Sequence, residues 1–538
     1  MSENQTNILI PKLNTQAGKR NSWGQLYGSS DALVIAQAAK QAGKDGKPVI
    51  VITPDTPTAT RLEYDIRFYA DEDIPVLIFP DWEILPYDVF SPHQDIISER
   101  LSTLSKLPAL EQGVLIVPVA TLLHRLAPTN FLEGNCFQID VGQKLDLQSM
   151  RSRLDSGGYR RVSQVIEHGD FAVRGSILDL FPMGNAQPFR IELFDDEVES
   201  IRSFDPESQR SIEKISNVNL LPAREFPFTK DAITQFRQAY RILFEGDPQS
   251  STIYHEVSNG NTPPGIEYYL PLFFETTNTL FDYLPDECVV FNMEGVTEAV
   301  QSFWSDVEER FEQSRYDVTR PILPPNILFL RENELFEHIG SQHQITLQHF
   351  EIPEKTSAFN FSTKKPPQLT LDARSEQPSA KLLAFIEEFD GRVLFCAEST
   401  GRRETLLEIV RDAGLHPVSV NGWQGFLSTE TKLAITVAGL EAGLLLPESG
   451  LALIAEPQLF GEQVMQQRRR QRKARDADQV IKNLVELEVG SPVVHEDNGI
   501  GRYLGLQTIS VGDMEQEFLT LQYAGGDKLF VPVSHLHL

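Results

Sequence analysis

The part of the chain closest to a catalytic motif is a glycine-containing stretch near the N-terminus, WGQLYGSSDALVIAQAA at 23–39. A loop that holds nucleotide phosphates needs the pattern G-x-x-x-x-G-K-[ST], in which backbone N–H groups and the lysine hold the phosphates and the hydroxyl holds magnesium. Gly24 and Gly28 are present, but Ser30 and Asp31 stand about where the lysine and the serine or threonine belong. Because a carboxylate repels a phosphate, the sequence predicts a degenerate loop that takes neither ATP nor magnesium as a cofactor.

No other motif of an enzyme or a metal site occurs in the sequence. It has no HExxH, GxSxG or paired CxxC pattern, and Cys136, Cys288 and Cys396 are far apart. His93 and Asp95 could form an acid–base pair, but a capped helix start explains them more simply. We therefore expect no catalytic residue, no metal and no disulfide framework, and a reducing cytoplasm as the location.

A second kind of chemistry, protein docking, is indicated in the segment 171–197, which the pattern predicts to form two antiparallel strands. Along 189–194, apolar side chains alternate with Arg190, Glu192 and Phe194, so one face is buried and these three face water. In the preceding strand Arg174 points away from the core. Arginine and aromatic side chains are enriched in binding hot spots, which favours a docking surface. The other interpretation is an ordinary half-buried sheet with an arginine paired to Asp195 or Asp196.

The composition limits which partners the whole chain can bind. Its 538 residues contain 48 Lys and Arg against 76 Asp and Glu, a net charge of −28. This charge argues against broad binding of nucleic-acid backbones. The most apolar stretch, 433–455, is interrupted by Glu441, Pro447 and Glu448, so no membrane segment is expected.

Alternating helix and strand signals predict a multidomain α/β protein. We place an α/β domain in two segments, 1–139 and 225–352, interrupted at 140–224 by a small sheet domain of short strands. A further α/β domain covers 353–465. A basic helix end, RRRQRKAR, and a linker fill 466–479, and a small all-β barrel of about five strands fills 480–538. The basic run is interpreted as a solvated helix end, with a nucleic-acid or interdomain contact as the alternative.

Several long motifs carry a resemblance to a known family. The stretches DWEILPYDVFSPHQDIISERLSTL, GYRRVSQVIEHGDFAVRGSILDLFPMG, FRIELFDDE, SFDPESQRS, PVVHEDNGIGRYLGL and KLFVPVSHLHL resemble the bacterial transcription-repair coupling factors. The resemblance runs from about residue 20 to 538. It implies a UvrB-like α/β module with the sheet domain inserted in it, a further α/β domain, and a Tudor- or CarD-like barrel. Members of this family continue into an ATP-dependent translocase on double-stranded DNA and a regulatory domain, neither of which this sequence contains.

The resemblance also implies partners and contact residues. The sheet domain of the family binds UvrA, and the residues of that surface match Arg174, Arg190 and Phe194. The barrel of the family docks on the β subunit of RNA polymerase, through a strand that corresponds here to Val493, Val494, His495, Glu496, Asp497, Asn498 and Gly499. Glu496 departs from the apolar residue that is familiar there.

The expected function is therefore that of a non-catalytic scaffold in transcription-coupled nucleotide-excision repair. It would hold stalled RNA polymerase and recruit UvrA. One alternative is a nucleotide-binding, UvrB-like enzyme with an unusual loop at 24–31, which titration with ATP and magnesium would detect. Another is a CarD-like transcription regulator acting through the barrel alone, which would leave the UvrA-binding surface without a purpose.

Overall fold

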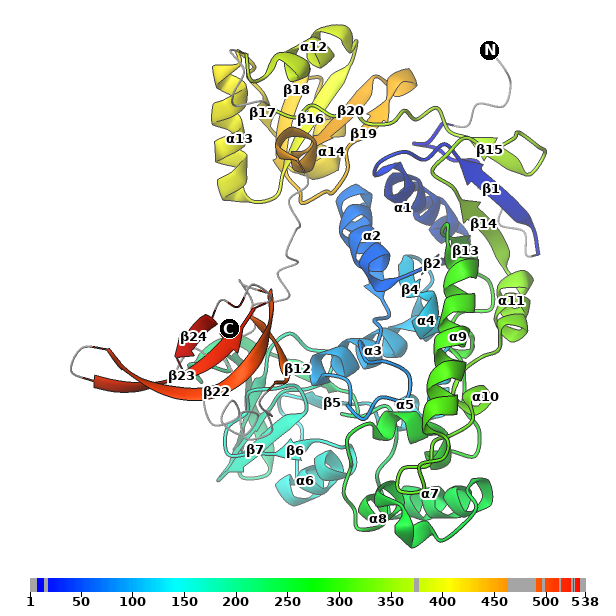
Figure 1. Cartoon of the computed structure of the whole chain (residues 1–538), viewed down its shortest axis with the longest axis vertical. Coiled ribbons are helices and arrows are strands. Elements are labelled where there is room, and N and C mark those ends of the chain that lie inside the picture. Colours follow the sequence, from blue (N-terminus) through cyan, green and yellow to red (C-terminus); the bar gives the residue numbers. More distant parts are fainter. Residues whose placement is uncertain are drawn as a thin grey trace. The chain divides into compact units, whose positions relative to one another are not determined.

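The computed structural model describes residues 7–13, 18–371, 377–461, 490–495, 499–511, 514–523, 526 and 528–532 (Figure 1). The chain divides into two compact units, Met1–Glu462 and Gln463–Leu538. The basic run and linker expected at 466–479 lie outside the described residues.

A seven-stranded parallel sheet forms the centre of the first unit. Its strand order is β15-β1-β14-β13-β2-β4-β3. The strands are β1 (Arg20–Gly24), β2 (Val49–Thr53), β3 (Val76–Ile78), β4 (Val114–Pro118), β13 (Val289–Asn292), β14 (His343–Leu347) and β15 (Ala358–Asn360). β2 and β4 are apolar except for Thr53 and buried at every position, as expected for parallel strands covered on both faces. The sheet thus combines strands from before and after the inserted domain, and it takes up β15, beyond residue 352.

The helices of this α/β domain lie on both sides of the insertion in the sequence. Those that precede the insertion are α1 (Ser30–Ala42), α2 (Thr56–Tyr69), α3 (Gln94–Lys106), α4 (Val119–Leu122) and α5 (Thr129–Asn135). Those that follow it are α7 (Lys230–Leu243), α8 (Thr252–Ser258), α9 (Val296–Ser314), α10 (Pro325–Leu328) and α11 (Glu332–Ser341). His93 is the N-cap of α3, and its Nδ1 accepts a hydrogen bond from the Asp95 N–H at 3.2 Å, which confirms the capped helix start.

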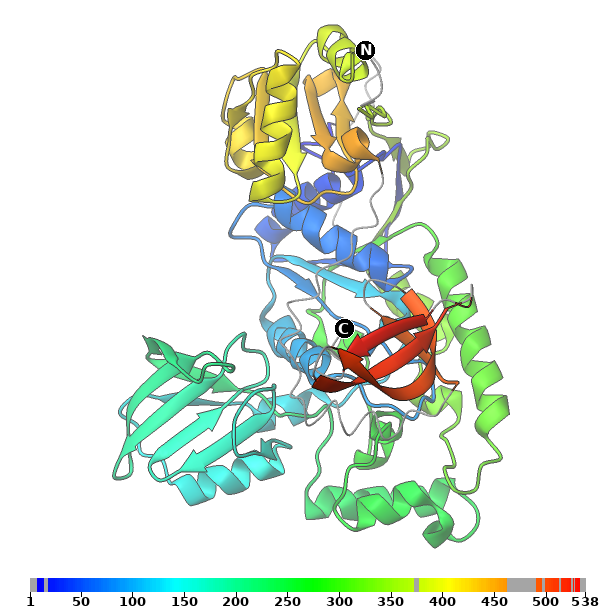
Figure 2. The ribbon, with the colours of Figure 1, turned by 60° about the vertical axis from the view of Figure 1, so that its left-hand side comes forward.

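The inserted sheet has six strands in the order β11-β10-β9-β8-β7-β6 (Figure 2, cyan). The strands are β6 (Arg160–Arg161), β7 (Asp170–Arg174), β8 (Ile177–Leu180), β9 (Phe189–Phe194), β10 (Glu197–Phe204) and β11 (Ser211–Ile215). β6 runs parallel to β7, and the other pairings are antiparallel. α6 (Leu147–Ser156) precedes the sheet. β5 (Phe137–Asp140) pairs with β12 (Asn217–Leu220) where the chain enters and leaves the insertion.

A second α/β layer completes the first unit. Its strand order is β17-β18-β16-β20-β19, with only β19 antiparallel to its neighbour. The strands are β16 (Arg392–Ala397), β17 (Val418–Ser419), β18 (Leu433–Val437), β19 (Leu444–Leu446) and β20 (Leu451–Ala455), and the helices are α12 (Ala380–Glu388), α13 (Thr400–Asp412), α14 (Gly422–Leu427) and α15 (Glu456–Phe460). α14 contacts α2, where Trp423 lies edge-on to Tyr69 with ring centroids 5.2 Å apart.

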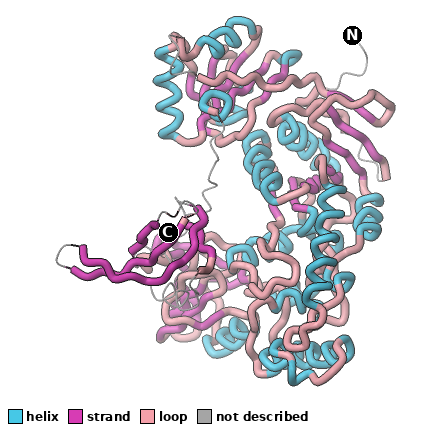
Figure 3. Tube along the Cα trace, in the orientation of Figure 1, coloured by secondary structure: helices cyan, strands magenta, loops and turns pink. Residues whose placement is uncertain are grey.

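The described part of the second unit consists of strands and loops (Figure 3). β21 (Pro492–His495), β22 (Gly499–Val511), β23 (Met514–Gln522) and β24 (Lys528–Pro532) form an antiparallel sheet in sequential order. This is four strands rather than about five, and no pairing between β21 and β24 closes the sheet within the described residues. The all-β character is confirmed, and the closed barrel stays a prediction.

Candidate functional site

Arg174, Arg190 and Phe194, here called the docking face, lie on one side of the inserted sheet. Arg174 is opposite Ile177 across β7 and β8, and Ile177 is opposite Glu192 across β8 and β9. Side chains that are directly opposite in a sheet share a face, as do residues two apart on one strand. Glu192 is two residues from both Arg190 and Phe194, so the register places all three residues of the docking face on one side.

The other side of these strands is buried, as the alternation predicts. Phe189, Ile191 and Leu193 of β9 belong to the main hydrophobic core. One end of the docking side is also covered, because Ala172 packs with Val165, Phe181 and Phe204 in a small separate cluster. The docking side is therefore open to solvent around β9 and closed at the end near Ala172.

Phe194 is the most exposed phenylalanine among the described residues, with 75% of its surface accessible. It precedes the tight turn at Asp195, whose φ of 58° lies in the left-handed region. The turn is held by a hydrogen bond of 2.7 Å from the Leu145 N–H to the Asp196 carbonyl, and Lys144 forms an ion pair with Asp196 at 3.0 Å. These contacts fix the backbone that presents the exposed ring.

Arg190 is paired with a neighbouring strand, not with the turn. Its Nε and one terminal nitrogen donate to the two carboxylate oxygens of Asp179, at 2.7 and 2.9 Å. Its guanidinium also lies 5.0 Å from the centroid of the Phe204 ring. The hydrogen bond to Asp179 is the main reason why the pKa of Arg190 is above its usual value. The alternative pairing with Asp195 or Asp196 is therefore wrong for Arg190.

Arg174 is held more loosely than Arg190. It donates to the Ser163 carbonyl at 3.0 Å, and its nearest nitrogen is 3.8 Å from Asp179. More than half of its side chain is exposed. Asp179 was missed by the sequence reasoning, although the alternation of ILDL in β8 places it on the same side as Ile177.

The degenerate phosphate loop lies between β1 and α1, as such a loop should, and it is filled by other parts of the chain. The Ser29 N–H donates to the Gly443 carbonyl at 3.0 Å. Gly28, with a φ of +63°, lies so close that a Cβ built on it would be 2.1 Å from the same oxygen. The Tyr27 N–H donates to the Thr363 hydroxyl at 3.1 Å. Backbone groups that would face phosphates in a nucleotide-binding loop therefore face the chain itself.

The start of α1 holds a buried charge network. Ser30 donates to the Tyr27 carbonyl at 2.7 Å, and Asp31 accepts from Arg61 at the same distance. Arg61 also reaches Asp65 at 3.0 Å, and both carboxylates are almost fully buried. Burial disfavours the charge of Asp31, but the charge of Arg61, its hydrogen bonds and the His349 ring 3.7 Å away outweigh this effect, so the pKa of Asp31 lies below the usual value. For Asp65, burial prevails and raises the pKa to about 7.

The predicted polymerase-binding strand is only partly described. Val493 is partly buried against the core of the second unit, and Val494 is 70% exposed. Across the hairpin, Val494 is opposite Ile500, which is equally exposed, and the backbone of His495 is opposite Gly499. The predicted contacts at Glu496, Asp497 and Asn498 lie outside the described residues. The hairpin thus displays an exposed apolar pair, Val494 on the edge strand β21 and Ile500 on β22.

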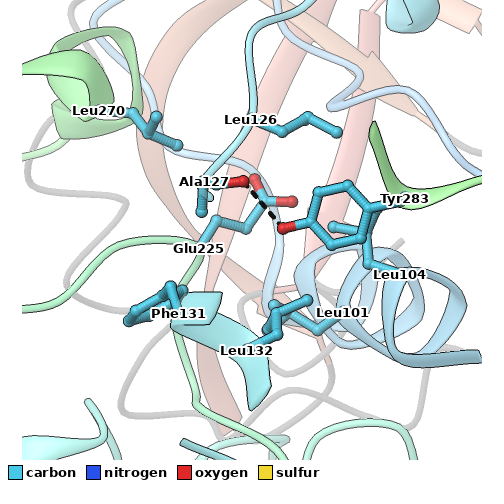
Figure 4. Close-up of a pocket in the computed structure, with 9 residues that line it drawn as sticks. All are labelled: Leu101, Leu104, Leu126, Ala127, Phe131, Leu132, Glu225, Leu270 and Tyr283. Atoms are coloured by element: carbon cyan, nitrogen blue, oxygen red, sulfur yellow. Dashed lines mark hydrogen bonds between the residues drawn. The ribbon is translucent and has the colours of Figure 1, made fainter. Parts of the chain in front are cut away.

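A small pocket elsewhere in the first unit is lined mainly by apolar side chains (Figure 4). The lining residues are Leu101, Leu104, Leu126, Ala127, Phe131, Leu132, Glu225, Leu270 and Tyr283. Its polar groups are already engaged, because Tyr283 donates to the Ala127 carbonyl at 2.8 Å and Glu225 accepts from Trp82 and Arg100. We interpret it as part of the core. No group of metal-ligating side chains and no membrane-spanning helix is found in the part of the chain that is described.

Three family models match separate parts of the sequence. The UvrB interaction domain matches residues 137–226, which include the docking face. The MFD, D3 domain matches residues 385–459, and the CarD-like/TRCF RID domain matches residues 487–538. The three matches follow the order of the inserted sheet, the second α/β layer and the C-terminal sheet.

Curated relatives match nearly the whole chain. Transcription-repair-coupling factors of Haemophilus influenzae and Escherichia coli are 40% and 42% identical over 99% and 98% of this chain, and the one of Bacillus subtilis is 27% identical over 92%. The matches cover 46%, 45% and 43% of those proteins, so the chain spans a little under half of their length. The family predicted from the sequence motifs is confirmed. Over nearly its whole length, the chain belongs to the transcription-repair-coupling factor family.

Proposed function

We propose that this chain is a scaffold that couples transcription to DNA repair without doing chemistry of its own. It recruits UvrA through the docking face and holds RNA polymerase, through its β subunit, by the hairpin of β21 and β22. The observation that carries the proposal is the exposed Phe194, flanked on one side of a sheet by two arginines, inside the segment that the UvrB interaction domain matches. Aromatic and arginine side chains are the usual anchors of protein interfaces.

The mixed charge of the docking face supports a protein as its partner. The docking side carries Glu192 and Asp179 beside its arginines, so it is mixed in sign. A surface that binds nucleic-acid backbones relies on many uncompensated cations. A mixed surface with an exposed aromatic side chain fits a protein interface with an apolar centre and a polar rim.

The filled phosphate loop supports a non-catalytic role. Nucleotide binding at residues 24–31 would require the Gly443 carbonyl to leave the Ser29 amide and a phosphate to approach buried Asp31. The second step brings like charges together in a site shielded from water, which is costly. The task of this module would then be to position the inserted sheet, not to hydrolyse ATP.

The triple variant Arg174→Ala, Arg190→Ala, Phe194→Ala tests UvrA recruitment. We expect it to lose UvrA in a pull-down, because truncating a few anchors costs about 2 kcal/mol or more each in a typical interface. Tyr64→Ala removes another exposed aromatic side chain, 60% accessible, from α2 and should keep binding. Retention of UvrA by a correctly folded triple variant would refute the proposal.

A further inference from the structure

We propose that Asp179 is a positioning residue of the docking face: it sets the direction in which the guanidinium groups of Arg190 and Arg174 meet an acidic partner surface. This inference rests on the proposed function, because it concerns how the same face recognises UvrA. It assigns a role to a buried carboxylate that cannot itself touch a partner.

Asp179 lies between the two arginines and is shielded from water. Only 2% of it is accessible, although it lies on the docking side of β8. Arg190 occupies both carboxylate oxygens in a two-point contact, and Arg174 is 3.8 Å from one of them. Two guanidinium groups therefore share one carboxylate, and the three side chains together carry one net positive charge.

The two-point contact restricts a side chain that is otherwise flexible. An arginine side chain loses rotamer entropy when it is held in one orientation, and a planar paired guanidinium has lost much of that entropy before a partner arrives. The remaining terminal nitrogen of Arg190 has a long contact of 3.4 Å with the Gln209 carbonyl. The N–H donors of Arg190 that remain free for a partner are therefore held in a fixed plane. Asp179 neutralises only one of the two guanidinium charges, and the more exposed Arg174 carries the remaining positive charge.

A carboxylate is the group on a partner that fits this arrangement best. Guanidinium donors in a fixed plane match the two oxygens of a carboxylate. The next acidic side chain on the face does not compete, because Glu192 is bound to Ser200 at 2.8 Å and lies 3.8 Å from Arg202. The face thus holds a prepared cationic point on the same side of the sheet as Phe194.

Asp179→Asn separates positioning from charge, because the two effects have opposite signs. The substitution keeps the shape of the side chain and makes the face more positive by one charge. If Asp179 contributed only its charge, an acidic partner would bind the variant faster and more tightly. If it positions the arginines, the complex should dissociate about tenfold faster, because losses of fitted contacts act mainly on the dissociation rate.

The measurement is the dissociation rate of purified UvrA from the immobilised 538-residue chain. A partly unfolded variant lowers the amount of binding but leaves the dissociation rate of the folded fraction unchanged, so this readout distinguishes positioning from stability. Asp65→Asn is the matched control. It replaces a carboxylate of α2 that is as buried as Asp179, at 2% accessible, and is also paired with an arginine, Arg61, but lies outside the inserted sheet, so its dissociation rate should stay within about twofold of the original.

A second variant keeps the proposal testable if Asp179→Asn does not fold. Arg190→Lys preserves both charges of the pair, but an ammonium group cannot form the planar two-point contact. It should also speed dissociation about tenfold if orientation matters. Unchanged dissociation from either folded variant, or equal acceleration by Asp65→Asn, would overturn the role of Asp179. If the triple variant of the docking face still bound UvrA, the proposed function itself would be refuted.

Discussion

The contact between Gly28 and Gly443 makes a quantitative prediction for Gly28→Ala. An added Cβ would lie 2.1 Å from the Gly443 carbonyl oxygen and 2.8 Å from Pro366. Both are far below ordinary van der Waals contact, and the nearer atom is backbone, which cannot rotate away. One of the two segments must therefore move by roughly 1 Å, which breaks the hydrogen bond from the Ser29 N–H to Gly443.

Gly46→Ala is the matched control for this substitution. Gly46 has nearly the same φ, +69° against +63° for Gly28, but nothing lies within 4 Å of its added Cβ. Both variants bear the strain of alanine in the left-handed region, about 1–2 kcal/mol. Only Gly28→Ala adds overpacking and a lost hydrogen bond, which together cost about 2–4 kcal/mol more.

Hydrogen exchange followed by mass spectrometry measures whether the contact between Ser29 and Gly443 is lost. In Gly28→Ala, exchange should accelerate in the peptide that contains the Ser29 amide and in the peptide around Gly443. In Gly46→Ala, both peptides should exchange as in the original chain. Chemical denaturation should show the larger loss of stability for Gly28→Ala. Equal effects of the two substitutions would refute the view that the second α/β layer fills the phosphate loop.

Two further predictions concern single side chains. The Asp31 carboxylate, 3.7 Å from Nε2 of His349, is the main cause of the raised pKa of His349, above its ordinary value of 6.5. This contribution to stability is therefore complete below pH 6.5 and lost as the pH rises through the raised pKa. Asp31→Asn should lower the pKa of His349 in an NMR titration, and an unchanged value would contradict the pairing. Val494→Arg should abolish the pull-down of RNA polymerase with a stability change of only about 0.5 kcal/mol, since Val494 is 70% exposed. Intact binding would show that the interface lies elsewhere.

The alternation along β9 was sufficient to predict which side chains are buried. Phe189, Ile191 and Leu193 lie in the core and Phe194 faces solvent, because a strand of period two leaves few other ways to bury three apolar residues. The partner of Arg190 was not predictable in the same way. It depends on the register between β8 and β9, which pairs Arg190 with Asp179, and nothing local to Arg190 encodes that register.

The layered α/β character was also predictable, but the composition of the first sheet was not. The apolar runs of β2 and β4 stand out in the sequence. β1 reads RNSWG and β15 reads AFN, neither of which is a strongly apolar run. They join the sheet through parallel pairing between segments more than 300 residues apart in sequence. Such pairings are decided by tertiary packing, which local propensity does not record.

The phosphate loop shows how far local motif reasoning extends. The sequence indicated that Asp31 would repel a phosphate, but it did not show what satisfies the loop instead. The helix start keeps a negative charge, now supplied by Asp31 itself, whose carboxylate accepts from the Ala32 N–H at 2.7 Å and pairs with Arg61. The Gly443 carbonyl, 414 residues from Ser29 along the chain, takes the backbone amide. An internal anion, Asp31, and an internal cation, Arg61, therefore stand in for the phosphate and the lysine of a nucleotide-binding loop. Lysine and threonine restored at positions 30 and 31 would still leave the Ser29 amide bound to the Gly443 carbonyl.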